Sequence, residues 1–248
     1  MRLQDIFKME MYKNRNDKPY LLIIAILTAM TTISTFIGIG MIEGKIALDN
    51  SGFLTALILL IVFSVLGLWI FSLLYPFRLL NVDYKNKVMG LIFASGVSRE
   101  KYYFVKISAT ILTCLIATFA ILFIPAVTFL SVYLEEFVKE IQKILVEFRL
   151  ADVFPFMLML LFSLLAYYVT LTTSVIITKG KMVGILLFFG FSFAVSTTQS
   201  IIGVPVLALS NLKADGMSIS FYLITLYSIA QIIIFGLIGL QVLKKQDL

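Results

Sequence analysis

Residues 154–178 read FPFMLMLLFSLLAYYVTLTTSVIIT, a run of twenty-five residues without a charged side chain. Five further uncharged runs are long enough to cross a bilayer, which takes about 20 apolar residues. Hydrophobic residues make up 60% of the 248 residues and charged residues only 14%, whereas soluble domains are about 25% charged. We therefore expect an all-α integral membrane protein whose single domain, residues 1–248, has transmembrane helices at about 19–42, 53–75, 107–130, 154–178, 182–207 and 217–243.

The composition also excludes several kinds of chemistry. The chain has no histidine, so it lacks the commonest general base and the commonest neutral metal ligand. Its one cysteine, Cys114, allows neither an intrachain disulfide nor a cysteine metal cage. We expect no catalytic residue and no metal site, and therefore no enzyme.

The positive charges indicate how the chain crosses the membrane. If both termini are cytoplasmic, fifteen of the twenty Lys and Arg residues fall in cytoplasmic segments. Such an excess is typical of the inner side of a membrane protein. We expect a multi-pass protein of a bacterial plasma membrane with both termini cytoplasmic, in which the net charge of +6 serves topology and no nucleic acid is bound.

Pro19 and Pro155 fall at the starts of expected spans, and the other three prolines lie after or inside spans. Pro76 follows the end of the second span, so we expect the helix to stop there. Pro125 predicts a kink in the third span, and Pro205 predicts a break in the fifth.

The expected spans contain no Asp, Glu, Lys or Arg. Proton-coupled transporters usually keep ionisable groups at membrane depth, although sodium can be held by carbonyls and hydroxyls. The chain also lacks the G-x-x-x-x-G-K-[ST] sequence that cradles ATP phosphates. Uphill transport by this chain would therefore need energy from a partner.

The longest expected cytoplasmic connection, residues 76–105, reads PFRLLNVDYKNKVMGLIFASGVSREKYYFV. Residues 81–94 have helical periodicity with one apolar face, Ser95-Gly96 predicts a turn, and Ser98 is suited to cap the helix that enters the third span. The result is a short amphipathic helix tied to a membrane helix. It would either receive motion from a soluble subunit or lie passively among lipid headgroups.

This connection resembles the cytoplasmic loop of type-2 ABC exporter permeases. That family has an acidic residue after the second span, then small residues, then a (P/V)-S-R-x-x-(Y/L)-x-x-x-K pattern. Here Asp83 replaces the usual Glu, and Val97 stands where proline is frequent. The pattern is completed by Gly90, Ser95-Gly96, Ser98-Arg99, Tyr102 and Lys106.

The resemblance implies a coupling helix that inserts into a groove of an ATP-binding subunit. The residues carried over for this role are Asp83, Tyr84, Met89, Gly90, Ser95, Gly96, Ser98 and Arg99.

The amino terminus is similar to the amphipathic entry helix of the same family. Leu3, Phe7 and Met11 recur four residues apart, and the basic residues of the same segment, Lys8 and Lys13 among them, suit anionic headgroups. Simple anchoring by positive charge explains the same residues equally well.

The expected outer loop between the third and fourth spans has helical spacing of apolar residues from Leu134 to Phe148. Type-2 permeases generally keep this loop short. We expect an extracellular amphipathic helix that acts as an outer gate or handles substrate, or one that merely packs against the spans. Its marker residues are Glu135, Phe137, Ile141 and Phe148.

Polar residues cluster in the first and fifth spans, and such clusters mark helix contacts or a lined cavity. The resemblance implies that these two spans line the pathway between paired permeases, and that the chain after the fifth span re-enters the membrane. The expected pathway residues are Thr28, Thr31, Thr32, Thr35, Ser192, Ser196, Thr197 and Gln199.

The resemblance therefore implies a permease subunit that pairs with a second copy or a related permease and with two cytoplasmic ATP-binding subunits. ATP and Mg²⁺ would bind those subunits, and this chain would bind no cofactor itself. A hydroxyl- and aromatic-rich route favours hydrophobic or amphipathic cargo, with antimicrobial or cytolytic peptides preferred. The alternatives are a drug or lipid efflux permease and the substrate-capture subunit of an ABC-type vitamin importer.

Overall fold

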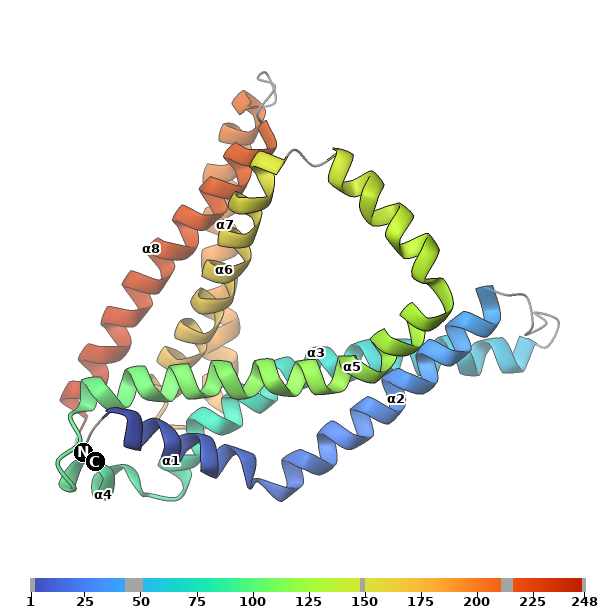
Figure 1. Cartoon of the computed structure of the whole chain (residues 1–248). Helices are drawn as coiled ribbons and strands as arrows, with labels where there is room; N and C mark the ends of the chain where they lie inside the picture. The colour runs from blue at the N-terminus through green and yellow to red at the C-terminus, as the bar shows by residue number, and fades with distance from the viewer. Residues whose placement is uncertain (1–2, 43–50, 148–149, 211–215, 247–248) are drawn as a thin grey trace. The chain divides into compact units, whose positions relative to one another are not determined.

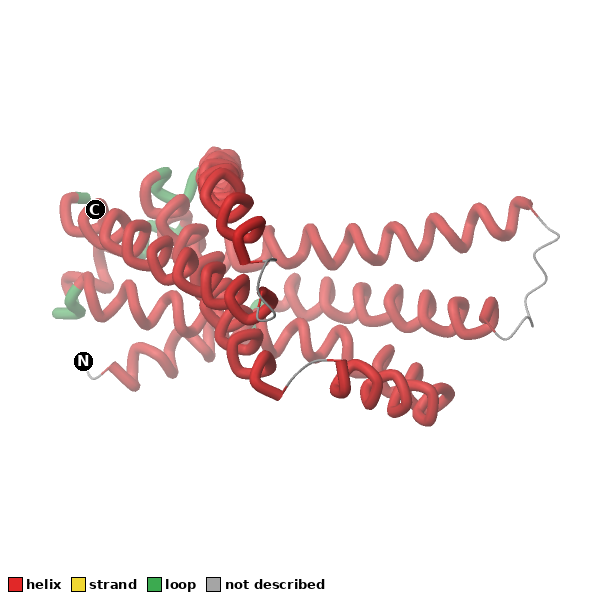
Figure 2. Tube along the Cα trace, turned by 90° about the horizontal axis from the view of Figure 1, so that it is seen from above, coloured by secondary structure: helices red, strands yellow, loops and turns green. Residues whose placement is uncertain are grey.

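The computed structural model describes residues 3–42, 51–147, 150–210 and 216–246, and in these residues every regular element is an α-helix (Figures 1 and 2). Six helices are long and apolar enough to cross a membrane. The prediction of an all-α, multi-pass membrane protein is confirmed to this extent. The helices are α1 (Leu3–Arg15), α2 (Lys18–Ile42), α3 (Ser51–Lys85), α4 (Met89–Ala94), α5 (Arg99–Glu147), α6 (Leu150–Ile177), α7 (Val183–Ser210) and α8 (Gly216–Lys245).

The chain divides into two compact units. Unit 1 comprises Met1–Phe7, Phe77–Ser108 and Ile144–Leu248, and unit 2 comprises Lys8–Pro76 and Ala109–Lys143. A single permease domain over residues 1–248 stays a prediction.

The core of unit 1 is the pair α6 and α8. Ser163 Oγ lies 3.3 Å from Ser228 Oγ, and Gln231 Nε2 donates to Thr170 Oγ1 at 2.8 Å. Further along, Thr173 Oγ1 donates to the Phe235 carbonyl of α8 at 2.8 Å. Because the residue numbers rise together on both helices, α6 and α8 run in the same direction. Buried polar contacts of this kind hold membrane helices together where lipid provides no hydrophobic force.

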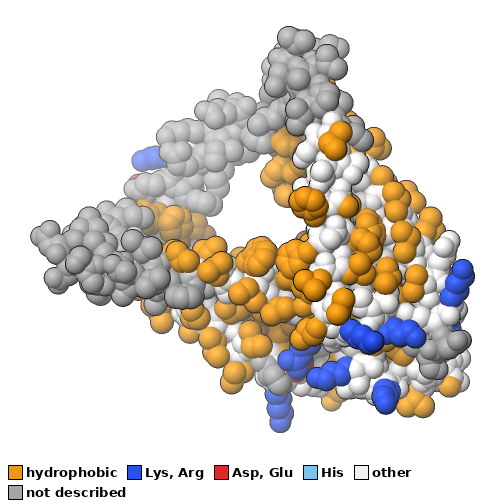
Figure 3. All heavy atoms as spheres, turned by 180° about the vertical axis from the view of Figure 1, so that it is seen from behind, with side chains coloured by type: hydrophobic (Ala, Val, Ile, Leu, Met, Phe, Trp, Pro, Cys, Tyr) orange, Lys and Arg blue, Asp and Glu red, His pale blue; other side chains and the backbone are white. Residues whose placement is uncertain are grey.

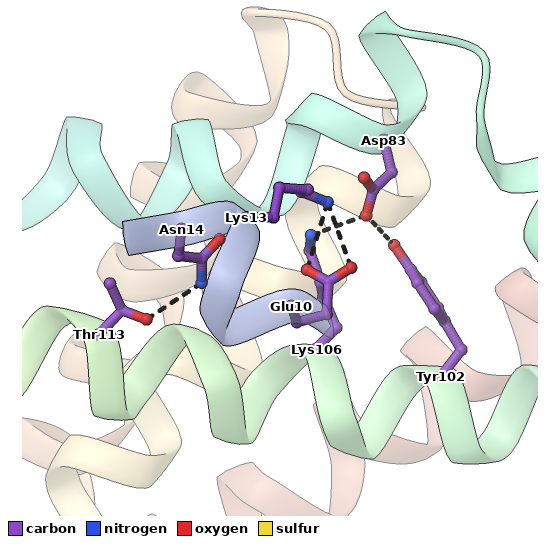
Figure 4. A network of polar contacts seen from close by, with 7 residues as sticks. All are labelled: Glu10, Lys13, Asn14, Asp83, Tyr102, Lys106 and Thr113. Carbon is purple, nitrogen blue, oxygen red and sulfur yellow. Dashed lines mark hydrogen bonds and ion pairs between the residues drawn. The ribbon is translucent and has the colours of Figure 1, made fainter. Parts of the chain in front are cut away.

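Unit 2 combines close helix packing with a few polar contacts. The rings of Tyr20 and Tyr75 stack with centroids 3.7 Å apart, which joins α2 to α3. Deeper in the same pair, Ser34 Oγ lies 2.8 Å from Ser64 Oγ. Asn14 Nδ2 of α1 donates to Thr113 Oγ1 of α5 at 3.0 Å (Figure 4).

The amino-terminal segment is helical, as its periodicity predicts. The side chains that it buries are Ile6, Glu10 and Asn14, which recur four residues apart. Leu3 is 51% exposed, so one end of the predicted apolar stripe remains available to lipid. That this helix lies at the membrane interface stays a prediction.

The prolines do not end or break helices where the sequence predicts. Helix α3 continues through Pro76, and α7 continues through Pro205. In α5, the residue with non-helical torsion angles is Tyr133 (φ −116°, ψ 28°), eight positions after Pro125. A proline removes only its own N–H from the hydrogen-bond ladder, and membrane helices tolerate that loss where neighbours compensate.

The predicted cytoplasmic helix at residues 81–94 is divided in two. Its first residues belong to the end of α3, and only Met89–Ala94 form the separate helix α4. The division occurs where Lys87 takes a left-handed conformation (φ 55°), which no helix interior allows.

Candidate functional site

The strongest polar cluster of unit 1 joins the end of α3 to the start of α5. Lys106 Nζ lies 2.7 Å from Oδ2 of Asp83, and the Tyr102 hydroxyl donates to the same oxygen at 2.5 Å (Figure 4). Tyr102 and Lys106 are four residues apart and so share one face of α5. Both charged side chains are only 4% exposed, so the pair is a buried ion pair that fixes α3 against α5.

The backbone between α3 and α4 forms a Schellman turn. The N–H of Val88 donates to the Asp83 carbonyl and the N–H of Lys87 donates to the Tyr84 carbonyl, both at 3.1 Å. These bonds satisfy carbonyls that the end of a helix leaves open. The turn therefore places α4 directly beside the buried ion pair.

Helix α4 has a packed side and an open side. Met89 is 3% exposed, and the Phe93 ring meets the Tyr102 ring edge-on at 5.5 Å. The Arg99 guanidinium lies 5.4 Å from the Phe93 ring centroid, within cation–π range. Leu91, by contrast, is 71% exposed. An exposed leucine on a short, well-anchored helix suits contact with another protein.

Arg99 also fastens the end of α8. Its Nη1 donates to the carbonyls of Leu243, Lys244 and Gln246 at 2.7, 2.6 and 3.0 Å. These are the carbonyls that the last turn of a helix leaves without partners, and they carry the negative end of the helix dipole. The residue after Arg99, Glu100, forms an ion pair with the Lys244 ammonium at 2.5 Å.

Gln246 extends this junction to two further helices. Its Nε2 donates to the Ile176 carbonyl of α6 at 2.6 Å, and its Oε1 accepts from the Tyr84 hydroxyl of α3 at 3.0 Å. The ends of α3, α5, α6 and α8 are therefore tied together around α4.

A small cavity lies inside this junction, lined by residues that include Tyr84, Met89, Tyr103, Lys106 and Leu243. Its volume of about 10 Å³ has room for roughly one water molecule. It is far too small for a cargo molecule.

The predicted coupling residues fall into two groups. Asp83 and Met89 are buried, and Tyr84 and Arg99 are engaged with the end of α8, so these four position α4 within the chain. The others are accessible or half-exposed, and Ser98 Oγ accepts from the Lys101 N–H at 3.4 Å, at the predicted cap position. The accessible group is Gly90, Ser95, Gly96 and Ser98.

The predicted pathway threonines of α2 satisfy their hydroxyls within the helix. Thr28, Thr31, Thr32 and Thr35 each donate to the carbonyl four residues earlier. Thr31 is buried, and its hydroxyl lies 3.5 Å from the Ile121 carbonyl of α5. In unit 2, Thr31 is therefore a helix-packing residue.

The predicted pathway residues of α7 are more accessible. Ser196 and Thr197 are exposed, and Ser192 and Gln199 are half-exposed. Thr197 Oγ1 donates to the Phe193 carbonyl at 2.6 Å. These residues belong to unit 1, whereas the threonines of α2 belong to unit 2.

The predicted outer helix is helical in its backbone as far as Glu147, as the end of α5. Glu135 is exposed. The side chains of Phe137 and Ile141, and the whole of Phe148, lie outside the described residues. Its position outside the cell stays a prediction.

The sequence analysis missed the residues that hold unit 1 together. Gln231 is a half-exposed partner of α6, although a glutamine in a membrane span is itself a signal of helix contact. Leu91 could have been found as the residue opposite the apolar face of its segment. The partners of Arg99 are backbone carbonyls, which every residue has, so the sequence does not predict them.

No known protein family, curated protein or solved structure matches this chain.

Proposed function

We propose that this chain is the membrane-spanning permease subunit of an ABC exporter, driven by ATP hydrolysis on two separate cytoplasmic subunits. One observation carries the proposal. Helix α4 is anchored on one side by the buried Asp83–Lys106 pair and by the Phe93–Tyr102 contact, while Leu91 on its other side is exposed. A helix held in this way transmits a push, because its anchors cannot slip without separating buried charges.

The anchors of α4 lead to several membrane helices. Asp83 belongs to α3 and Lys106 to α5, and Arg99 binds the last carbonyls of α8. Helix α8 is in turn bonded to α6 along its length. A force on α4 would therefore act on four helices at once, which is what a lever between an ATP-driven subunit and a transport pathway requires.

The charge distribution supports an external source of energy. The six expected spans have no Asp, Glu, Lys or Arg, and the buried Asp83–Lys106 pair is neutral as a pair. A chain without ionisable groups at depth is poorly suited to a proton relay. ATP and Mg²⁺ bound by partner subunits would supply the work instead.

The exposed hydroxyls of α7 are consistent with a polar surface at membrane depth. Ser196 and Thr197 lie in a predicted span and are exposed in this chain. Such residues usually pack against another helix or line a cavity. We propose that this side of α7 faces a second permease, either a copy or a related chain, and lines a route for hydrophobic or amphipathic cargo. Antimicrobial or cytolytic peptides are the favoured cargo.

Copurification tests the assignment. The full chain is coexpressed with each ABC ATP-binding subunit of the same genome, and complex formation and ATPase activity are measured in reconstituted vesicles. Leu91→Asp is expected to weaken the complex at least roughly tenfold, since burying an unpaired carboxylate costs several kcal/mol. Asn16→Asp adds the same charge at another exposed site and should leave the complex intact. The proposal fails if no ATP-binding subunit binds the chain, or if both variants behave like wild type.

A further inference from the structure

The turn between α6 and α7 brings lysines to the end of a membrane span. The N–H of Gly180 donates to the Val175 carbonyl at 2.9 Å and the N–H of Lys179 donates to the Ile176 carbonyl at 3.1 Å, which is a Schellman turn. Lys179 itself takes the left-handed conformation (φ 51°), a position that glycine fills at least cost. The turn thus holds a lysine at a position where glycine would fit more easily.

This turn is packed tightly against the end of α3. A Cβ atom added to Gly180 would lie 2.8 Å from Tyr84 Cβ and 3.3 Å from Asn81 Cβ, so the backbone of the turn touches α3 directly. Helix α3 ends a few residues later with the same kind of turn, in which Lys87 is left-handed. Two lysine-bearing turns are therefore held at neighbouring positions of unit 1.

The result is a cluster of positive charge, which we call the lysine cluster: Lys85, Lys87, Lys179 and Lys181. All four side chains are exposed, and among the described residues none of them forms an ion pair. The sequence has no acidic residue from position 153 to position 214. On α3, the neighbouring carboxylate of Asp83 is buried and neutralised by Lys106. The lysine cluster therefore attracts an anion.

Apolar side chains continue directly from the lysine cluster. Met182 is 74% exposed, Val183 is 59% exposed and Leu186 is 72% exposed at the start of the α7 span. Figure 3 shows Lys and Arg side chains gathered toward one end of a face whose described remainder is largely apolar. A ligand that satisfies both features has a negative headgroup joined to a hydrocarbon tail.

We propose that the lysine cluster and the first turn of α7 form a binding site for one anionic phospholipid, whose phosphate contacts the lysines and whose acyl chains lie along Met182, Val183 and Leu186. Lysines near a membrane surface attract anionic lipids in general. The packed Gly180 turn makes this site specific, because it fixes two of the lysines relative to α3. The inference depends neither on the exporter proposal nor on the orientation of the chain.

Spin-labelled lipids provide the test. The full chain is reconstituted in phosphatidylcholine vesicles, and the fraction of immobilised label is compared for spin-labelled phosphatidylglycerol and phosphatidylcholine. The wild type is expected to prefer phosphatidylglycerol. Lys179→Gln with Lys181→Gln should reduce that preference, with a loss of roughly fivefold for each lysine at low salt. Lys179→Arg with Lys181→Arg keeps both charges and should keep the preference.

A second pair of variants separates a shaped site from loose attraction. Gly180→Ala retains every charge but forces the turn away from Tyr84, so the preference for phosphatidylglycerol should fall. Gly96→Ala is the matched control, because Gly96 also has a positive φ (86°) but has no atom within 4 Å of an added Cβ. The control should behave like the wild type.

Two results would overturn the proposal. An unchanged lipid preference in the double glutamine variant would show that the lysine cluster does not select lipid. Displacement of spin-labelled phosphatidylglycerol by inorganic phosphate, but not by chloride at equal ionic strength, would show a site for a small anion instead. Loss of the preference in the glutamine variant without such displacement supports a lipid site.

Discussion

Lys106 Nζ lies 2.7 Å from Oδ2 of Asp83, with both side chains 4% exposed, although twenty-three positions separate the two residues in sequence. The pair closes the loop that carries α4. Since each charge is buried, each depends on the other, and the geometry of α4 depends on both.

The first prediction concerns this pair. Asp83→Asn removes the buried carboxylate that Lys106 and Tyr102 contact and should lower the free energy of unfolding by about 3–5 kcal/mol. Adding Lys106→Met replaces the second charge of the pair with an apolar side chain and should restore part of the stability. Thermal unfolding of the purified protein in detergent measures both effects. If Asp83→Asn unfolds like the wild type, the pair does not fasten α3 to α5.

The second prediction uses two glycines of α8. A Cβ at Gly239 would lie 2.8 Å from Thr173 Oγ1 and 2.9 Å from the Tyr103 hydroxyl, so Gly239→Ala should destabilise the fold by about 1–3 kcal/mol. A Cβ at Gly236 would lie 3.9 Å from Val169 Cγ1. Gly236→Ala should therefore be neutral or stabilising by up to about 1 kcal/mol. Equal unfolding temperatures for the two variants would contradict the packing of α8 on α6 and α5.

The third prediction concerns the two sides of α4. In a Cys114→Ala background, Leu91→Cys should react rapidly with a membrane-impermeant maleimide, since Leu91 is 71% exposed. Met89→Cys should react slowly in the folded protein, because Met89 is 3% exposed. Labelling of Leu91→Cys in inside-out vesicles and not in intact cells would match the predicted orientation. The reverse pattern would place α4 outside the cell.

The fourth prediction concerns the end of α8. Arg99→Ala removes the donor to three terminal carbonyls, and a hydrogen bond from a charged group contributes about 1.5–3 kcal/mol. Hydrogen exchange in the last turn of α8 should therefore accelerate by roughly tenfold or more. Lys101→Ala, two positions away and exposed, is the control and should exchange like the wild type. Unchanged exchange in Arg99→Ala would mean that the last turn is held by other contacts.

The sequence predicts the helical, membrane-spanning class because hydrocarbon allows few alternatives. A span without water must satisfy its backbone internally, so hydropathy and length suffice to find it. The ends of the helices are less predictable. In the sequence, Pro76 predicts the end of a helix, yet α3 continues through it to Lys85. The chain changes direction after that, at the left-handed residue Lys87.

The roles of polar residues are harder to derive than their presence. Gln199 and Gln231 both lie in apolar spans and both are half-exposed, and Gln231 bonds to Thr170 in the α6–α8 contact. Which of two similar residues joins two helices depends on how the helices meet. Asp83 is a similar case, since its position in the loop suggests contact with a partner, whereas its side chain is buried against Lys106.

The parallel course of α6 and α8 has a consequence for how the protein is made. Gln231 follows Thr170 by 61 positions, so α6 enters the membrane before its partner has been synthesised. During that interval the hydroxyls of Thr170, Thr172, Thr173 and Ser174 need no partner, because each donates to the carbonyl four residues earlier. Helix α6 can therefore be stable in lipid before α8 is synthesised. Its polar face becomes a contact surface only after α8 has inserted beside it.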